Sequence, residues 1–205
     1  MTIKMTSADQ ERIVTAIHKA ELGTAGEIVC VLARASSDYA YAPLIWSSFF
    51  ALAAPWPLIA FTQLSAERIF IIQLLVFFIA TVILSIGAVR MWLVPRRVKR
   101  ARAFRAAVEQ FHIRGLARTA DRTGVLIFVS MAEHYARIVV DDGIAAKVAQ
   151  NEWQSAVNLL VSHMREDRVA EGFVGAIDYC APLLAKHFPP RPNNANELPD
   201  RLWLI

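Results

Sequence analysis

The chain has 205 residues, of which 56% are apolar and 20% are charged, with a formal net charge of +4. So large an apolar share excludes an intrinsically disordered chain, and two cysteines are too few for a small scaffold held by disulfides. The mean hydropathy of +0.38 arises mainly from residues 39–89, whereas the flanking segments have the composition of a soluble domain. The sequence therefore predicts one small domain attached to a membrane.

The first segment, residues 1–38, contains a predicted helix and a predicted strand. Apolar residues recur at helical spacing over residues 8–22, and Ser7 with Gln10 is typical of a capping box in front of them. Residues 27–34 are rich in β-branched side chains and predict a buried strand that contains Cys30. A single helix and strand cannot form a core alone, so their partners must come from further along the chain.

Two uncharged apolar segments follow, at residues 43–61 and 69–89. Each has the roughly 20 residues that a helix needs to cross the hydrocarbon core of a bilayer. Pro55 and Pro57 must kink or interrupt the first helix, so a re-entrant or bent segment remains an alternative to a full span there. The sequence predicts a transmembrane helical hairpin within residues 39–93.

A run of basic residues follows the second apolar segment, whereas Arg68 is the single basic residue of the connection between the two. By the positive-inside rule, both termini face the cytoplasm and the protein is an integral, multi-pass membrane protein. The run is interpreted as a topology signal that contacts lipid phosphates, and no nucleic-acid partner is expected, because no aromatic residues are interleaved for base stacking. Its members are Arg90, Arg96, Arg97, Lys99, Arg100, Arg102 and Arg105.

The rest of the domain is predicted within residues 94–188. A basic helix over 99–118 precedes two strands, 125–130 and 136–141, which the turn at 131–135 joins as an antiparallel hairpin. Helices over 151–166 and 170–187 follow, with Trp153 in the core and Cys180 as a second buried, reduced thiol. The fold class is thus α/β, a small sandwich of strands and helices interrupted by the transmembrane hairpin.

Residues 189–205 form a tail with four prolines, predicted to be extended or disordered. Trp203 and Leu204 near its end have two interpretations. They are either a docking segment for a partner or the membrane surface, or a frayed chain end.

Three motifs in this order resemble the TPM domain family, and in particular its short bacterial form with two inserted transmembrane helices, which implies a bacterial inner membrane. They are T-A-G-E-I-V at 24–29, G-V-L-I-F-V at 124–129 and A-R-I-V-V-D-D-G-I at 136–144. The resemblance implies a TPM-like sandwich over residues 7–34 and 105–188. Family members are linked to acid phosphatase activity, to photosystem repair and to divalent-ion binding.

The resemblance also implies a metal site on the loops beside the strands. The matching acidic positions are Glu27, Asp141 and Asp142, and Ca²⁺ or Mg²⁺ is the ion that such carboxylates would bind. The family pattern often places an acid after the glycine that here is Gly143, whereas this chain continues with Ile144 and alanines. A hard cation prefers six or more oxygens, and further loop acids are Asp121 and Glu133. The alternative is an acidic strand end that is solvated or caps the next element.

No hydrolase motif of the common classes occurs in the chain, so no catalytic residue is assigned. The sequence therefore favours a membrane-anchored cytosolic module with an accessory role, either binding another membrane protein or maintaining membrane proteins. The alternative is a metal-dependent phosphatase at the membrane surface. The two differ in whether Glu27, Asp141 and Asp142 meet in one pocket.

Overall fold

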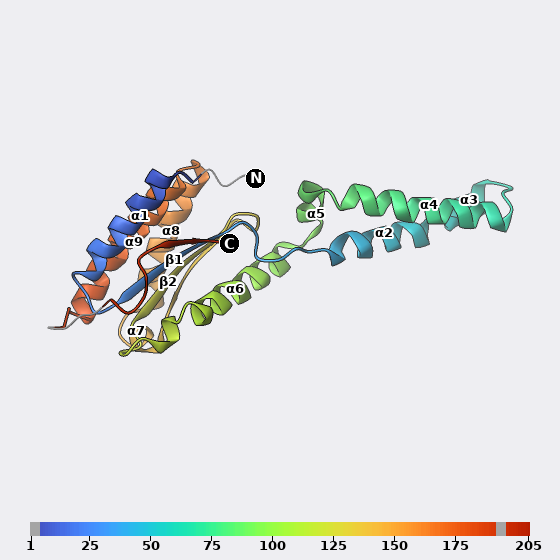
Figure 1. The fold of residues 1–205 in the computed structure, drawn as a ribbon. Helices are drawn as coiled ribbons and strands as arrows, with labels where there is room; N and C mark the ends of the chain where they lie inside the picture. The colour runs from blue at the N-terminus through green and yellow to red at the C-terminus, as the bar shows by residue number, and fades with distance from the viewer. Residues whose placement is uncertain (1–4, 192–195) are drawn as a thin grey trace. The chain divides into compact units, whose positions relative to one another are not determined.

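The computed structural model describes residues 5–191 and 196–205 and divides the chain into two compact units (Figure 1). The domain unit comprises residues 1–36 and 101–205, and the hairpin unit comprises residues 37–100. Residues 1–4 of the predicted first segment and residues 192–195 of the predicted tail lie outside the described residues. An inserted hairpin between two parts of one domain is the organisation expected from the sequence.

The domain unit is built on a mixed sheet with the strand order β3-β2-β1-β4 in the described part of the chain. β1 pairs in parallel with β2, from Glu27 opposite Gly124 to Ala33 opposite Ser130. β2 pairs with β3 in the antiparallel hairpin that the sequence predicts, and β4 adds to the other side of β1 in parallel. The strands are β1 (Glu27–Ala33), β2 (Gly124–Ser130), β3 (Tyr135–Val140) and β4 (Leu202–Leu204).

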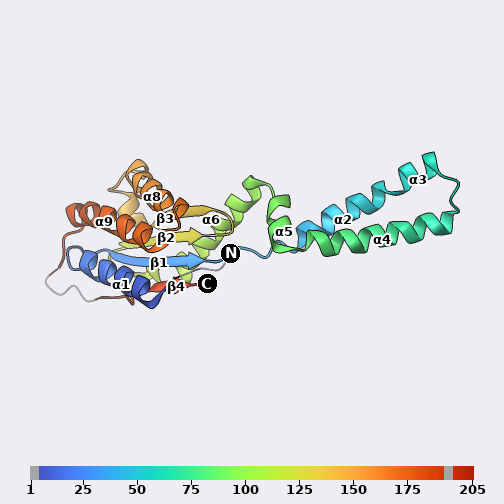
Figure 2. The same cartoon turned by 90° about the horizontal axis from the view of Figure 1, so that it is seen from above.

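Helices cover both faces of this sheet, which gives the predicted α/β sandwich (Figures 1 and 2). One face packs against α1 (Ser7–Glu21), α8 (Gln150–Arg165) and α9 (Val169–His187). The other face packs against α6 (Arg96–Ile113) and the short 3₁₀ helix η1 (Leu116–Arg118). Every residue of β1 and β2 is buried, as expected for strands covered on both faces.

Alternating side chains of β1 build the two halves of the core. Ile28, Cys30 and Leu32 point into the cluster with α1, α8 and α9, while Val29 and Val31 point toward α6. Cys30 and Cys180 are both free and buried, in agreement with the predicted buried thiols. Burial raises the pKa of the Cys30 thiol well above its ordinary value and that of Cys180 to about 12, so both thiols stay protonated.

Two helix boundaries differ from those predicted. The capping box of α1 consists of Thr6 and Asp9 rather than Ser7 and Gln10, because Thr6 is the residue in the extended conformation and its hydroxyl accepts from the Asp9 N–H at 3.1 Å. The helix α6 begins at Arg96 and ends at Ile113, short of the predicted residue 118. Gly115 with φ +80° ends it there, since this left-handed conformation suits glycine.

The end of the tail is ordered and extended, which agrees with the extended alternative of the prediction rather than the disordered one. Residues 202–204 form β4, and Leu202 is buried in the core beside β1. Trp203 lies between two guanidinium groups, with Arg114 at 3.5 Å and Arg201 at 3.3 Å from its ring centre. Trp203 therefore packs within its own domain rather than forming a free docking tip. A three-residue strand after a Pro-rich segment is too short for sequence periodicity to predict.

The hairpin unit contains two helical stretches long and apolar enough to cross a membrane, Tyr41–Phe61 and Ala66–Leu84. The first is interrupted at Ala54, where the prolines predicted a break. The second helix ends at Leu84 rather than at residue 89, because Ile86 is extended and a new short helix starts at Gly87. The helices are α2 (Tyr41–Ala53), α3 (Pro55–Phe61), α4 (Ala66–Leu84) and α5 (Gly87–Leu93).

A polar contact joins the two arms of the hairpin. The Thr81 hydroxyl on α4 lies 2.9 Å from the Ser47 hydroxyl on α2, and Ser47 is fully buried between the helices. Small residues on α2, such as Ala51, face the same side and allow the helices to approach closely. In contrast, the large apolar side chains of both helices point outward, among them Phe49, Leu52, Phe78 and Val82.

Trp153 offers a direct test of the core. Its side chain is 1% exposed on α8, so Trp153→Ala should lower the free energy of unfolding by about 3–5 kcal/mol. Urea unfolding of the full-length protein in detergent, followed by circular dichroism, measures this change. Trp92→Ala is the matched control, because Trp92 is 84% exposed and its loss should cost less than about 0.5 kcal/mol. A cost below about 1 kcal/mol for Trp153→Ala would refute the core placement.

Candidate acidic site at the sheet end

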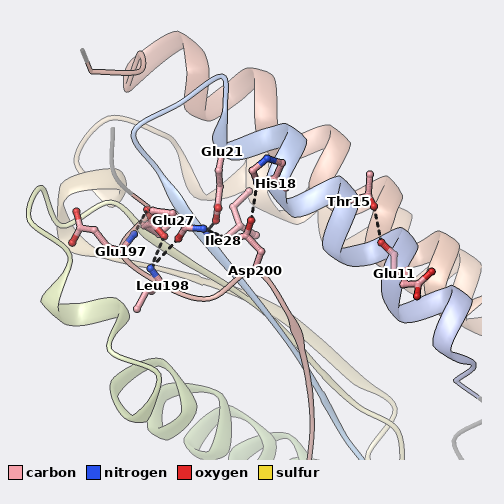
Figure 3. Close-up of polar contacts among 10 residues, drawn as sticks. Glu11, Thr15, His18, Glu21, Glu27, Ile28, Glu197, Leu198 and Asp200 are labelled. Atoms are coloured by element: carbon pink, nitrogen blue, oxygen red, sulfur yellow. Dashed lines mark hydrogen bonds and ion pairs between the residues drawn. The ribbon is translucent and has the colours of Figure 1, made fainter. Parts of the chain in front are cut away.

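Carboxylates gather at the end of the sheet where β1 and β2 begin (Figure 3). Glu21 is the last residue of α1, and Glu27 is the first residue of β1. Glu197 and Asp200 lie in the segment that precedes β4. His18 lies one turn before Glu21 on α1. We refer to these five residues as the acidic site.

The T-A-G-E motif places Glu27 in this site by fixing the loop between α1 and β1. The Thr24 hydroxyl donates to the Phe188 carbonyl at 2.7 Å, which ties the loop to the end of α9. The Thr123 hydroxyl donates to the Ala25 carbonyl at 2.8 Å, and the Glu27 N–H donates to the Thr123 carbonyl at 3.1 Å. The loop is thus held from two sides before the strand starts.

Glu27 is buried and holds the C-terminal segment. Its two carboxylate oxygens accept the backbone N–H groups of Glu197 and Leu198, each at 3.2 Å. Burial raises the pKa of Glu27 above its ordinary value, and the two N–H donors act in the opposite direction. The chemistry available to Glu27 here is the binding of backbone donors from the tail.

Glu21 is the most perturbed acid of the site. One of its oxygens accepts the Ile28 N–H at 2.8 Å. Burial raises the pKa of Glu21 to about 9, and a side-chain hydrogen bond with Asp200 acts in the same direction. An ionised carboxylate only accepts hydrogen bonds, so the Glu21–Asp200 contact requires a proton. Glu21 is therefore neutral at pH 7.

A cleft of about 340 Å³ lies beside these carboxylates, lined in part by His18, Glu21, Glu27 and Asn196. His18 Nδ1 lies 3.0 Å from an Asp200 carboxylate oxygen, so Asp200 contacts an imidazole as well as Glu21. The two other predicted ligands, Asp141 and Asp142, are not among the lining residues of the cleft.

Asp141 caps a helix and is itself buried. It precedes α7 (Asp142–Ala145), and its carboxylate accepts the Asp142 N–H at 2.7 Å as the N-cap. Arg122 Nη1 lies 3.5 Å from the same oxygen, Oδ1. The other oxygen, Oδ2, is buried without a hydrogen-bond partner within the described ranges. Asp141 therefore caps the next element, which is the alternative predicted from the sequence for this strand end. Asp142 is exposed.

Glu27 and Asp141 lie at the same end of the sheet but on opposite sides of β2. Glu27 is opposite Gly124 at the start of β2, and the Asp141 N–H donates to the Gly124 carbonyl at 2.9 Å from the β3 side. Two strand spacings separate their backbones by about 10 Å. Glu27, Asp141 and Asp142 thus do not form one ligand set in this arrangement. Over residues 5–191 and 196–205, the structure contains no group of three His, Cys, Asp or Glu side chains placed to hold a metal ion.

The two further candidate acids lie elsewhere. Glu133 is at the opposite end of the sheet, after β2, where it accepts the Ser36 N–H at 2.9 Å and a hydrogen bond from Ser130. Asp121 is exposed and forms an ion pair with Arg191. The partners of Glu133 lie at the far end of the sheet from Glu27, whereas Arg191 lines the same cleft as Glu27.

Sequence reasoning did not identify Glu21 or Asp200 as site residues. Glu21 continues an amphipathic helix, and Asp200 belongs to a tail with no recognisable periodicity. Their contact depends on β4 pairing with β1, which brings the two ends of the chain together. One feature of the sequence could have indicated Glu21: it is an acidic residue at the end of a predicted helix, shortly before a predicted buried strand.

Part of the chain matches a known family, and the fold is similar to that of a solved structure. Residues 87–182 match the family model of the TPM domain, a range that contains β2, β3, α7, α8 and most of α9. The solved NMR structure of the BA42 protein from the psychrophilic bacterium Bizionia argentinensis has a similar fold, with a TM-score of 0.62 and 20% identity over 98% of this chain and 96% of that one. Among curated proteins, no sequence matches this chain. The resemblance to the TPM domain family that the sequence motifs predict is confirmed over residues 87–182.

The neutral state of Glu21 predicts a pH dependence of stability. The unfolded chain releases the Glu21 proton near its ordinary pKa of 4.5, whereas the folded chain keeps it until about pH 9. The folded state therefore binds more protons, so this group lowers the free energy of unfolding as pH rises from 4.5 to 9. Glu21→Gln removes this contribution.

Urea unfolding of the wild type and Glu21→Gln at pH 5 and pH 8 measures the effect. The variant should gain stability relative to the wild type at pH 8, and the difference should be smaller at pH 5. Glu11→Gln is the control, because Glu11 is an exposed carboxylate on the same helix. Equal differences at both pH values would contradict a neutral, buried Glu21.

Proposed function

We propose that the protein is a membrane-anchored module in which the hairpin unit crosses the bilayer and the TPM domain lies in the cytosol with both termini. Its role is accessory, through binding another membrane protein or maintaining membrane proteins. The observation that carries the anchoring is the outward apolar surface of α2, α3 and α4. Every residue of α4, which is described in full, is at least partly exposed.

Exposed apolar surface of this extent is unfavourable in water. Phe49, Phe61, Phe78 and Val82 are each between 60% and 87% exposed, whereas a helix in the core of a soluble protein buries such side chains. A bilayer removes this surface from water without any other partner. The helices also start at residue 41, well beyond the position of an amino-terminal signal sequence.

The ends of the hairpin unit support a spanning orientation. Trp56 on α3 and Trp92 on α5 are 81% and 84% exposed, and tryptophan prefers the two interfaces of a membrane. The run of basic residues follows Trp92, whereas the connection after Trp56 carries Arg68 as its basic residue. This charge difference favours the side of Trp92 as the cytosolic one.

The accessory role draws support from the acidic site. Glu27 holds the tail through two backbone N–H groups, and Glu21 accepts the Ile28 N–H at the start of β1. Both acids therefore contribute to the architecture of the domain. A module of this kind offers its surface to a partner protein while the hairpin keeps it at the membrane.

The topology can be tested in intact cells. A reporter fused after Ile205 should be resistant to protease added from outside, because the proposed orientation places this end in the cytosol. A reporter inserted after Gln63, between α3 and α4, is the matched control and should be cleaved. Cleavage of the reporter at Ile205 in unbroken cells would contradict the orientation.

A metal-dependent phosphatase is the second candidate. The family model is designated TPM phosphatase, and one observation in this chain favours the candidate. Asp141 is 4% exposed, and its Oδ2 atom has no hydrogen-bond partner in the described part of the chain. A buried, unsatisfied carboxylate oxygen is costly, and a bound cation would satisfy it.

An assay of aryl phosphate hydrolysis separates the two candidates. We expect the purified full-length protein to show the same rate with Mg²⁺, with Ca²⁺ and with a chelator, and the Asp141→Asn/Asp142→Asn variant to match it. Asparagine retains an N-cap side chain for α7, and Asp178→Asn serves as a surface control. Metal-dependent turnover that the double variant alone loses would place the phosphatase first.

A further inference from the structure

The first ten residues of α6, at positions 96–105, carry six cationic side chains that we call the cationic ring. Between Glu67 and Glu109 the sequence contains no acidic residue. Within residues 5–191 and 196–205, none of the six forms an ion pair with a carboxylate. The members are Arg96, Arg97, Lys99, Arg100, Arg102 and Arg105.

These charges surround the helix rather than forming a stripe. At about 100° per residue, the six side chains leave no gap wider than about 80° around the helix axis. The buried residues of α6 are Ala103, Ala107 and Phe111, so contact with the sheet concerns mostly the second half of the helix. Five of the six cations are exposed and Lys99 is partly exposed.

We infer that the cationic ring binds the phosphate groups of anionic phospholipids. Cations that point in all directions can be neutralised together only by ligands that surround the helix, as lipid headgroups do in the interfacial layer of a bilayer. A nucleic acid duplex would approach one face and leave the opposite cations unpaired. The six cations have no carboxylate partners within the described residues, so their positive charge is neutralised better by lipids with a net negative charge than by zwitterionic lipids.

The position of the ring along the chain agrees with this assignment. It follows α5 directly, and α5 carries the exposed Trp92 in the hairpin unit. Tryptophan side chains occupy the headgroup region, which is the region where lipid phosphates lie. The inference rests on the proposed anchoring by the hairpin and adds a lipid class to it.

The test uses full-length protein reconstituted from detergent into nanodiscs of two compositions. One contains phosphatidylcholine alone, and the other contains phosphatidylcholine with about 30% phosphatidylglycerol as the anionic probe. The same cations also act as a topology signal during insertion in the cell. Reconstitution from detergent bypasses that insertion step, so the result reports lipid binding alone. Hydrogen exchange of the amides in residues 96–105 is measured at low and at high salt. The anionic lipid should slow this exchange several-fold at low salt and lose its effect at high salt.

Two matched variants accompany the wild type. Arg97→Gln/Arg100→Gln/Arg102→Gln removes half of the ring and should abolish the difference between the two lipid compositions. Lys19→Gln/Arg165→Gln/Lys186→Gln removes three exposed cations from α1, α8 and α9 and should retain it. Glutamine preserves helix propensity in both variants.

The outcomes are distinct. Equal exchange in both compositions, or an equal effect of the control variant, would overturn the lipid assignment. Protection by a short DNA duplex but not by phosphatidylglycerol would overturn it in favour of a nucleic acid ligand. If the protein does not enter either type of nanodisc, the proposed anchoring itself fails, a result that differs from entry without lipid preference.

Discussion

The parallel pairing of β1 with β2 is the constraint on which the rest of the structure depends. It joins the segment before the hairpin unit to the segment after it, in an unbroken register from Glu27 to Ala33. Parallel neighbours require a long crossover connection, and here that connection contains the entire hairpin unit as well as α6. The domain can therefore accept an inserted hairpin without a break in its sheet, provided that the chain returns to the edge of β1.

The same pairing determines the chemistry at the sheet end. Because β2 lies between β1 and β3, it separates Glu27 from Asp141 and leaves each acid with its own partners. On the other side of β1, β4 brings Asp200 near Glu21, and burial of the Glu21 side chain keeps it protonated. The acids of the site thus each have a separate partner. Glu27 and Glu21 accept backbone N–H groups and Asp200 contacts His18, so they do not form one set of ligands.

Much of the fold follows from local patterns in the sequence. The apolar residues of α8 recur at helical spacing, and β1 is a run of β-branched residues that follows turn residues. The prolines in the first apolar stretch predict the break at Ala54. The strand β4 and the contact between Glu21 and Asp200 were not predictable in this way, because they depend on pairing between distant segments. The candidate ligands Glu27, Asp141 and Asp142 were predicted on loops beside strands, but the separation of Glu27 from Asp141 depends on strand order, which no local pattern encodes.

The central claim is that residues before and after the hairpin unit form adjacent strands, and one measurement tests it most directly. In full-length protein with selectively labelled valine and leucine methyl groups, the methyls of Val29 and Leu126 should give a nuclear Overhauser effect, because the two residues are register partners on one face of the sheet. Val29→Ala provides the assignment of this cross-peak. Absence of the cross-peak, together with rapid amide exchange over residues 27–33, would contradict the account.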